Sequence, residues 1–262
     1  MPSTNDSATR ANPVKEPSIS SAMIQAAREL AEQADVLHFS PPVSFIYNPL
    51  QYAAKAHDAY IRRYGASTKK ALFIGMNPGP FGMAQTGVPF GEIAAVRDWL
   101  GICEAPDIPA NTHPKRPIQG FDCPRSEVSG RRFWGLMKER FKEPESFFAN
   151  HFVMNYCPLI FMEESGRNRT PAQLPAQERE PLIQICDKHL QRVVELLQPA
   201  YLIGIGAFAA KQATSAMKSA GAQLGNLKIC TLLHPSPASP KANAGWAEIA
   251  TAQLIDCSLW QA

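Results

Sequence analysis

The sequence predicts an α/β protein, a three-layer α/β/α sandwich around a four-stranded parallel sheet, and three observations lead to this fold class. Short apolar runs alternate with segments of helical periodicity, as in parallel strands joined by crossover helices. Each run ends abruptly at glycine, proline or a polar side chain. The chain has 262 residues and is 45% hydrophobic, enough for a sizeable core. The expected strands are residues 71–75, 151–156, 201–205 and 227–233.

Helices are expected before, between and after these strands. Apolar residues recur at helical spacing from Ile24 to Leu37, and the Pro-Pro pair at 41–42 ends that segment. An extended stretch over 43–49 follows. Ser129 is a suitable N-cap for the helix that precedes the second strand. The expected helices are residues 20–37, 52–64, 96–100, 130–141, 176–197, 207–218 and 240–258.

The chain is expected to form a disordered tail over residues 1–18 and a single domain over 19–262. The first 18 residues are rich in Ser, Thr, Asn and Pro, a composition typical of disorder. No internal repeat and no boundary to a second domain is visible in the remainder. The Pro-rich loop over 103–127 is too long for an idle connection, so it is expected to be functional or mobile.

Composition argues against several classes of protein. No apolar run approaches the roughly 20 residues of a membrane helix, and the N-terminus lacks an apolar signal core, so no membrane partner is expected. The 6 cysteines form no C-x-x-C pair, which leaves a zinc ribbon unsupported and predicts reduced, buried thiols. The net charge of +3 permits a polyanionic partner without requiring one.

Three polar side chains follow strands at the point where each strand ends. Asn77 follows the first strand, Asn155 closes the second and His234 follows the fourth. In a parallel sheet these ends lie on one edge, where open α/β sheets build their sites. Two carboxamides and one imidazole are a poor set of metal ligands. They suit recognition of a planar heterocycle by hydrogen bonds, since an amide offers an acceptor beside a donor.

Asn155 is well suited to discriminate between pyrimidines. Its carbonyl can accept from a ring N–H while its NH₂ donates to the adjacent exocyclic oxygen, which matches the edge of uracil and opposes that of cytosine. A mismatch would leave buried polar groups unpaired, which costs several kcal/mol. Phe90, in a Gly/Pro-rich segment, offers a stacking face worth roughly 1–3 kcal/mol.

Long motifs extend around these residues. Residues 75–92 (GMNPGPFGMAQTGVPFGE) and 234–237 (HPSP) resemble the two motifs of the single-strand-selective monofunctional uracil-DNA glycosylases. The similarity spans about residues 41–246 and includes segments 96–101, 113–117, 126–130 and 165–168. The resemblance implies the uracil-DNA glycosylase fold, a monomer that acts without a cofactor or metal, and action on DNA. The implied location is cytoplasmic and nucleoid-associated in a bacterium, or nuclear in a eukaryote.

The resemblance also implies roles for individual residues. Asn77 and His234 are the expected catalytic pair: Asn77 orients a water, because a carboxamide is no strong base, and His234 hydrogen-bonds the base oxygen on which charge develops. Gly79 and Met83 leave room beside C5, so that 5-hydroxymethyluracil is accepted as well as uracil. The expected substrate-binding residues are Met76, Gly79, Met83, Phe90 and Asn155. The reaction is hydrolysis of the N-glycosidic bond in single- and double-stranded DNA, with no strand cleavage.

The expected DNA contacts are Lys115, Arg116, Pro235, Ser236, Pro237, Ala238 and Lys241. The segment after His234 matches a loop that wedges into the duplex. At 238–239 this chain has Ala-Ser where a bulkier or basic residue is expected, which bears on activity on double strands. Further basic residues in the same loops are Arg125, Arg131, Arg132, Arg167 and Arg169.

Three alternatives remain open at this stage. One is a related uracil-DNA glycosylase with a mismatch or hypoxanthine preference, and another is a non-catalytic binder of damaged DNA. The third is a nucleotide-dependent oxidoreductase, because residues 204–209 (GIGAFA) fit a dinucleotide signature. No acidic residue is placed to bind a ribose, so these glycines are expected to serve helix–sheet packing or approach to the DNA backbone.

Overall fold

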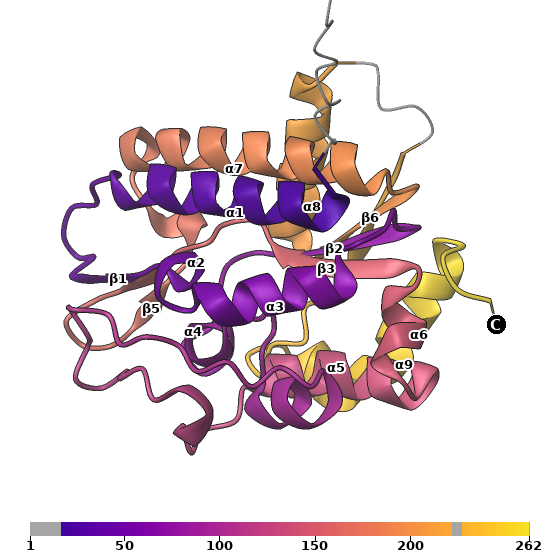
Figure 1. Ribbon diagram of the computed structural model, residues 1–262, viewed down its shortest axis with the longest axis horizontal. Coiled ribbons are helices and arrows are strands. Elements are labelled where there is room, and N and C mark those ends of the chain that lie inside the picture. Colours follow the sequence, from indigo (N-terminus) through magenta and orange to yellow (C-terminus); the bar gives the residue numbers. More distant parts are fainter. Residues whose placement is uncertain (1–16, 222–226, 262) are drawn as a thin grey trace, which may run out of the picture.

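The computed structural model describes residues 17–221 and 227–261 (Figure 1). The expected disordered tail therefore lies almost wholly outside the described residues. At the start of the described chain, the Ser18 hydroxyl accepts a hydrogen bond from the backbone N–H of Ser21 at 3.2 Å and caps helix α1, Ile19–Asp35. Helix α1 thus begins one residue before the expected start and ends two residues early.

The central sheet has four parallel strands, as the sequence predicts. Its order is β3 (His151–Asn155), β2 (Ala71–Gly75), β6 (Tyr201–Ile205) and β7 (Lys228–Leu232). In this register Gly75 of β2 lies opposite Asn155 of β3, and Gly204 of β6 lies opposite Thr231 of β7. The strands that flank the motifs therefore end together at one edge.

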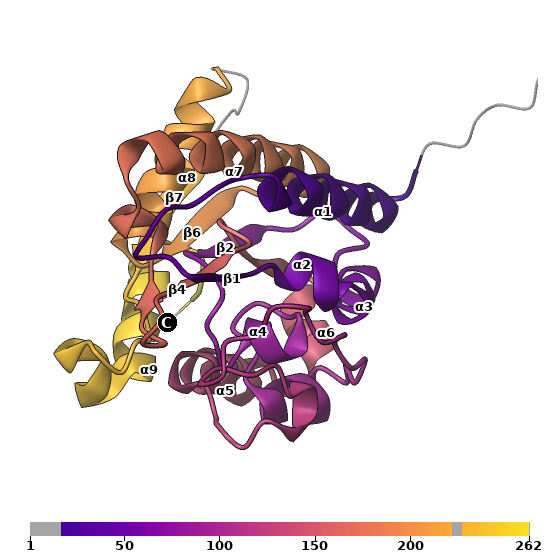
Figure 2. The ribbon, with the colours of Figure 1, turned by 90° about the vertical axis from the view of Figure 1, so that its left-hand side faces the viewer.

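Helices cover both faces of the sheet (Figures 1 and 2). One layer contains α1, α7 (Ala176–Leu197) and α8 (Ala207–Ser219), and the other contains α5 (Val128–Phe141), α6 (Pro144–Phe148) and α9 (Pro240–Asp256). All residues of β2 are buried, as expected of a strand enclosed on both faces. This arrangement confirms the three-layer sandwich.

A second, smaller sheet was not expected from the sequence. It is antiparallel, in the order β1 (Phe45–Tyr47), β4 (Ile160–Met162) and β5 (Asn168–Arg169). The extended segment over 43–49 contains β1, but β4 and β5 are too short to show a period of two. This sheet holds the segment after β3 next to the chain that leaves α1.

The start of α5 differs from the expectation. The helix begins at Val128, with Glu127 at the N-cap position, so the prediction that Ser129 is the N-cap is wrong. Among the described contacts, the Glu127 side chain makes no capping hydrogen bond. Glutamate is a poor N-cap, and its presence here indicates another use for the side chain.

Other elements differ in detail. The expected helix over 52–64 is divided at Ala53 into α2 (Pro49–Tyr52) and α3 (Ala54–Tyr64). A π-helical turn, η1 (Ala95–Trp99), replaces the expected short helix. The short helix α4 (Met83–Thr86) lies within the first motif, and two 3-10 turns, η2 (Gly120–Asp122) and η3 (Pro171–Gln173), lie in loops.

Three further features of the described residues concern membrane-spanning helices, cysteines and metal ligands. None of the described helices has the length and apolar character needed to cross a membrane. All six cysteines are free thiols; four are buried, whereas Cys103 is exposed and Cys230 is half-buried. Over 17–221 and 227–261, no three His, Cys, Asp or Glu side chains are grouped closely enough to hold a metal.

Candidate active site at the carboxyl ends of the sheet

The sheet brings the three polar side chains of the sequence analysis to one edge. Asn155 is the last residue of β3, Asn77 follows β2 by two residues, and His234 follows β7 by two residues. Strand β6 lies between β2 and β7, and Gly206 follows it directly, at the N-cap position of α8. A β-carbon at Gly206 would lie 3.4 Å from Cβ of His234, so this end of β6 touches the histidine.

Asn155 and Phe90 converge on Gly75. A β-carbon at Gly75 would lie 2.3 Å from Oδ1 of Asn155 and 2.8 Å from Cε2 of Phe90. Any residue other than glycine would displace both side chains. The amide expected to read the edge of a base and the ring expected to stack on its face therefore adjoin one another.

The Phe90 backbone adopts an uncommon conformation, with φ of 53°. A bulky residue in the left-handed region stores strain, which persists only where surrounding contacts hold it. Here the Phe90 ring stacks on Phe133 of α5, with centroids 5.0 Å apart and planes at 24°. A further aromatic neighbour of the Phe90 ring is the His234 ring, whose centroid is 6.1 Å away.

Asn77 is fixed by a backbone contact. Its Nδ2 donates to the carbonyl oxygen of Leu159 at 3.1 Å, and Leu159 lies between β3 and β4. The backbone of Met76 is also held, because its carbonyl accepts from Cys157 N at 2.9 Å. With its N–H engaged, the Asn77 carboxamide retains its oxygen as an acceptor, the group needed to orient a water.

His234 is half-buried, and this burial lowers the pKa of its imidazole. The ring is therefore neutral at pH 7 and carries one N–H donor. The preceding residue is fixed on both sides: Leu233 N donates to Gln253 Oε1 at 2.8 Å, and Trp246 Nε1 donates to Leu233 O at 2.7 Å. Helix α9 thus positions His234 by fixing the backbone of the residue before it.

Arg132 of α5 supports the loop that follows His234. Its Nη1 donates to the carbonyl oxygens of Pro235 at 3.1 Å and Ser236 at 3.3 Å, and its Nη2 donates to Asn243 Oδ1 at 2.9 Å. From the sequence, this arginine was expected among the basic residues of the loops that face DNA. In the structure, its guanidinium group instead hydrogen-bonds the backbone of the loop expected to contact DNA.

The remaining expected DNA contacts lie on the loop after His234, at the start of α9 and in the Pro-rich loop over 103–127. Pro237, Ala238 and Lys241 are exposed, Ser236 is half-buried and Pro235 is buried. Lys115 is exposed, with Nζ 3.4 Å from Ser165 O. The guanidinium groups of Arg116 and Arg125 lie over the ring of Phe81 at 5.3 and 4.1 Å from its centroid. Arg169 pairs with Glu163 at 2.7 Å.

Met83 and Gly79 adjoin the site but are not surrounded by empty space. The Asn155 Nδ2 donates to Sδ of Met83 at 3.2 Å, and Met83 is only 2% exposed. At Gly79 the neighbour is the carboxyl group of Glu127, whose Oε1 would lie 1.8 Å from a β-carbon. Glu127 was not singled out from sequence, because nothing in the pattern distinguishes it from a surface charge, and Arg132 was named only as one of several basic residues in the loops expected to contact DNA.

The glycine-rich turn over 204–209 serves packing. A β-carbon at Gly204 would lie 2.3 Å from Ala210 N and 2.4 Å from Ala210 Cα, so α8 crosses directly against β6. This confirms the expectation that these glycines permit close helix–sheet contact. The dinucleotide signature therefore has a structural explanation.

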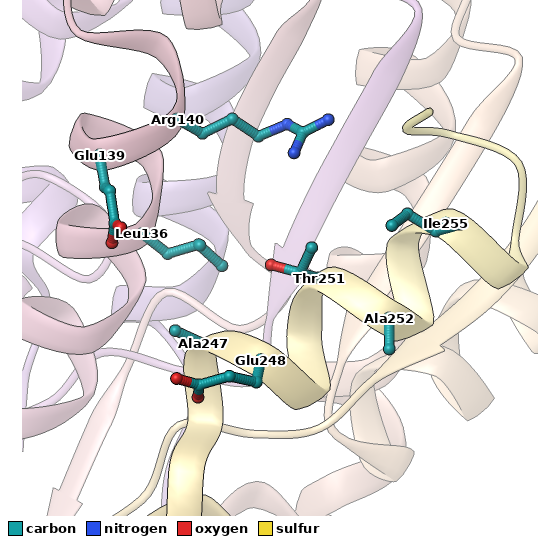
Figure 3. Close-up of a pocket in the computed structure, with 8 residues that line it drawn as sticks. All are labelled: Leu136, Glu139, Arg140, Ala247, Glu248, Thr251, Ala252 and Ile255. Atoms are coloured by element: carbon teal, nitrogen blue, oxygen red, sulfur yellow. The ribbon is translucent and has the colours of Figure 1, made fainter. Parts of the chain in front are cut away.

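A separate groove of about 600 Å³ lies between α5 and α9 (Figure 3). Leu136, Glu139 and Arg140 of α5 line one side of it, and residues 247–255 of α9 line the other. None of the strand-end residues borders this groove. It is therefore distinct from the candidate site.

Comparison with known proteins gives a consistent result. Residues 62–253 match the Uracil DNA glycosylase superfamily. Relatives named single-strand selective monofunctional uracil DNA glycosylase include one from Bos taurus, 46% identical over 242 residues, covering 92% of this chain and 88% of the relative. Another, from Rattus norvegicus, is 47% identical over 258 residues, covering 94% and 91%. The crystal structure of Pedobacter heparinus SMUG2 shares the fold, with a TM-score of 0.64 at 18% identity over 92% of this chain and 97% of that one.

The sheet, the strand-end side chains and the superfamily match together define a DNA glycosylase, a hydrolase of glycosidic bonds that serves base excision repair. Within the uracil DNA glycosylase superfamily, the chain belongs to the single-strand selective monofunctional uracil-DNA glycosylases.

Proposed function

We propose that this protein hydrolyses the N-glycosidic bond of uracil and of 5-hydroxymethyluracil, in single-stranded DNA by preference and in double-stranded DNA as well. The observation that carries the proposal is the convergence at Gly75: Asn155 and Phe90 adjoin each other there, and His234 lies 6.1 Å from the Phe90 ring. In a base held between these groups, Asn155 would hydrogen-bond the edge and Phe90 would stack on the face. His234 would stabilise the negative charge that develops on the base.

Base recognition follows from the chemistry of Asn155. In the free protein its NH₂ donates to the sulfur of Met83, a weak acceptor. A uracil carbonyl is a stronger acceptor, so the base competes favourably for this donor. Phe90 is held in place by Phe133 before the base arrives, which limits the entropy lost on binding.

Cleavage of the bond requires charge to be stabilised on both sides. The target base leaves the stack at a cost of a few kcal/mol, which is smallest for an unpaired base and so favours single strands. As the bond breaks, negative charge accumulates on the base, and a hydrogen bond from neutral His234 to its O2 strengthens. Asn77 holds the water that attacks the sugar cation. Because a carboxamide is too weak a base to activate that water, the glycosidic bond breaks before the water attacks, and the path is dissociative.

Contacts with the DNA backbone are assigned to Lys115, Arg116, Lys241 and the loop at 235–238. Cations that contact phosphates make binding weaken with added salt. The small Ala238 at the tip of the loop provides little bulk to replace an extruded base. We therefore expect slower release from duplexes than from single strands.

The test uses the wild-type protein with matched oligonucleotides that carry uracil, 5-hydroxymethyluracil or hypoxanthine at one position. Each is offered single-stranded and paired, and alkali then cleaves any abasic site. Release of both uracils, faster from single strands and without cleavage before alkali, is the expected result. Faster release of hypoxanthine would favour a related glycosylase specificity. Tight binding to abasic DNA without any base release would contradict an enzymatic role.

A further inference from the structure

Glu127 places a carboxyl group against the loop that carries Asn77. A β-carbon at Gly79 would lie 1.8 Å from its Oε1, and one at Gly82 would lie 2.2 Å from its Oε2. Both glycines are therefore in direct contact with the carboxyl group. On a third side, a β-carbon at Gly130 would lie 2.9 Å from Oε2 and 2.1 Å from the carbonyl oxygen of Phe90. The group thus sits between the Asn77 loop and the Phe90 segment.

The carboxyl group has an unmet need for a hydrogen bond. Its Oε2 is buried and has no hydrogen-bond partner in the described part of the chain. Burial, with a smaller contribution from the charge of Glu92, raises the pKa of Glu127 to about 7. The neighbouring Glu92 is satisfied, because its Oε1 accepts from Ser126 Oγ at 3.0 Å and its Oε2 accepts from Ala95 N at 2.9 Å. Of these two carboxyl groups, only that of Glu127 has an oxygen left to hydrogen-bond a ligand.

A buried polar group without a partner costs about 1–3 kcal/mol, so its retention calls for a role. Helix capping is not that role, since the side chain makes no hydrogen bond to the α5 amides although it occupies the N-cap position. Its contact with Gly79 suggests one, because Gly79 is the residue expected to face C5 of the base. The group therefore lies where a substituent on C5 would arrive.

We propose that Glu127 is a specificity-determining residue, whose carboxyl group forms the wall of the base site at Gly79 and hydrogen-bonds a hydroxyl group carried on C5 of the base. This inference rests on the proposed function. The carboxylate accepts from the hydroxyl O–H, and the protonated acid donates to the hydroxyl oxygen, so the bond forms in either state. Uracil itself has no group to reach Glu127, which leaves its release independent of this contact.

The test compares Glu127→Leu with wild type on single strands that carry uracil or 5-hydroxymethyluracil at the same position. The expected result is a fall of about tenfold or more in the ratio of kcat/KM for 5-hydroxymethyluracil to that for uracil, with uracil release within about threefold of wild type. Equal loss on both substrates would overturn the inference and leave Glu127 a packing residue. Glu92→Gln is the matched control, because it alters the neighbouring buried carboxyl and should leave the ratio unchanged.

Glu127→Asp keeps the proposal testable should the leucine variant not fold. The aspartate retains the carboxyl group and withdraws it by one methylene from Gly79. The same ratio should fall several-fold, and an unchanged ratio would overturn the inference. Failure of the proposed function would appear differently, as a wild-type protein that releases no uracil. A wild type that releases uracil but not 5-hydroxymethyluracil would refute the role of Glu127 alone.

Discussion

The rings of Phe90 and His234 lie with their centroids 6.1 Å apart and their planes at 42°, although they come from opposite halves of the chain. Phe90 belongs to the segment that follows β2, and His234 follows β7 at the far edge of the sheet. This contact joins the aromatic wall of the candidate site to its imidazole. It makes the two motifs of the sequence parts of one site.

Replacement of Asn155 tests how the base is recognised. In Asn155→Asp the side chain loses the NH₂ that would donate to the uracil carbonyl, so uracil release should fall about tenfold or more. The preference for uracil over cytosine should narrow at the same time. Rates on oligonucleotides with each base measure both effects. Asn150→Asp, on the exposed residue before β3, is the control and should leave the preference intact.

Replacement of Arg132 tests whether the loop after His234 must be held. Lysine cannot reproduce three guanidinium hydrogen bonds to two carbonyls and Asn243. We expect Arg132→Lys to slow uracil release on the order of tenfold to a hundredfold, because small displacements of a site are costly. The neighbouring Arg131 is exposed, so Arg131→Lys should behave as wild type. Equal effects of the two variants would contradict a specific role for the Arg132 hydrogen bonds, because both variants keep the positive charge.

Two glycine substitutions, expected to change the free energy of unfolding in opposite directions, test how tightly the helices around the sheet are packed. Gly204→Ala forces a β-carbon to 2.3 Å from Ala210 N and should destabilise the protein by at least ~1–3 kcal/mol. Gly135→Ala places its β-carbon in open space within the described structure of α5 and should stabilise by ~0.5–1 kcal/mol. Urea unfolding measures both. A neutral Gly204→Ala would mean that α8 can shift without cost.

Stability should decline below pH 6.5. Burial lowers the pKa of His57, His151 and His189 to about 4 each, whereas the unfolded chain titrates at 6.5. Between these values the unfolded state binds more protons, so stability present above pH 6.5 is lost as the pH falls toward 4. Glu127 opposes this trend: its pKa is raised to about 7, so its contribution is present below 4.5 and lost as the pH rises.

The three histidines outweigh the single glutamate, and the net slope near pH 5.5 should be roughly 2 kcal/mol per pH unit. Urea unfolding at pH 7, 6 and 5 measures this slope. Glu127→Gln removes the opposing contribution and should steepen the loss. A flat profile in both proteins would show that these side chains are not buried as described.

The strands and their ends could be predicted because their signals are local. Strands β2 and β6 have the expected bounds, since each is a short apolar run closed by glycine or a polar residue. The two residues of β5 carry no such signal and are a strand only because β4 lies beside them. Likewise, whether α5 starts at Val128 or after Ser129 depends on tertiary contacts of Glu127, which periodicity does not contain.

The part of the site that lies at strand ends could also be predicted from the sequence. Asn77, Asn155 and His234 were found because each follows a strand, and strand ends share an edge. Glu127 was not recognised, and Arg132 was expected only as one of several basic residues near DNA, because an acidic and a basic residue in a loop-to-helix segment look like surface charges. Glu127 contacts Gly79, and Arg132 donates to the carbonyl oxygen of Pro235. Both partners are distant in sequence, so the sequence pattern does not reveal these contacts.

The central claim is that a carboxamide and an imidazole from opposite halves of the chain act on one extruded base. The most direct measurement is the single-turnover rate of uracil release from a single strand by wild type, Asn77→Ala and His234→Ala, with thermal unfolding as a check on the fold. Each variant should unfold near the wild-type temperature and release uracil at least about a hundredfold more slowly. Wild-type rates in both variants would contradict the account.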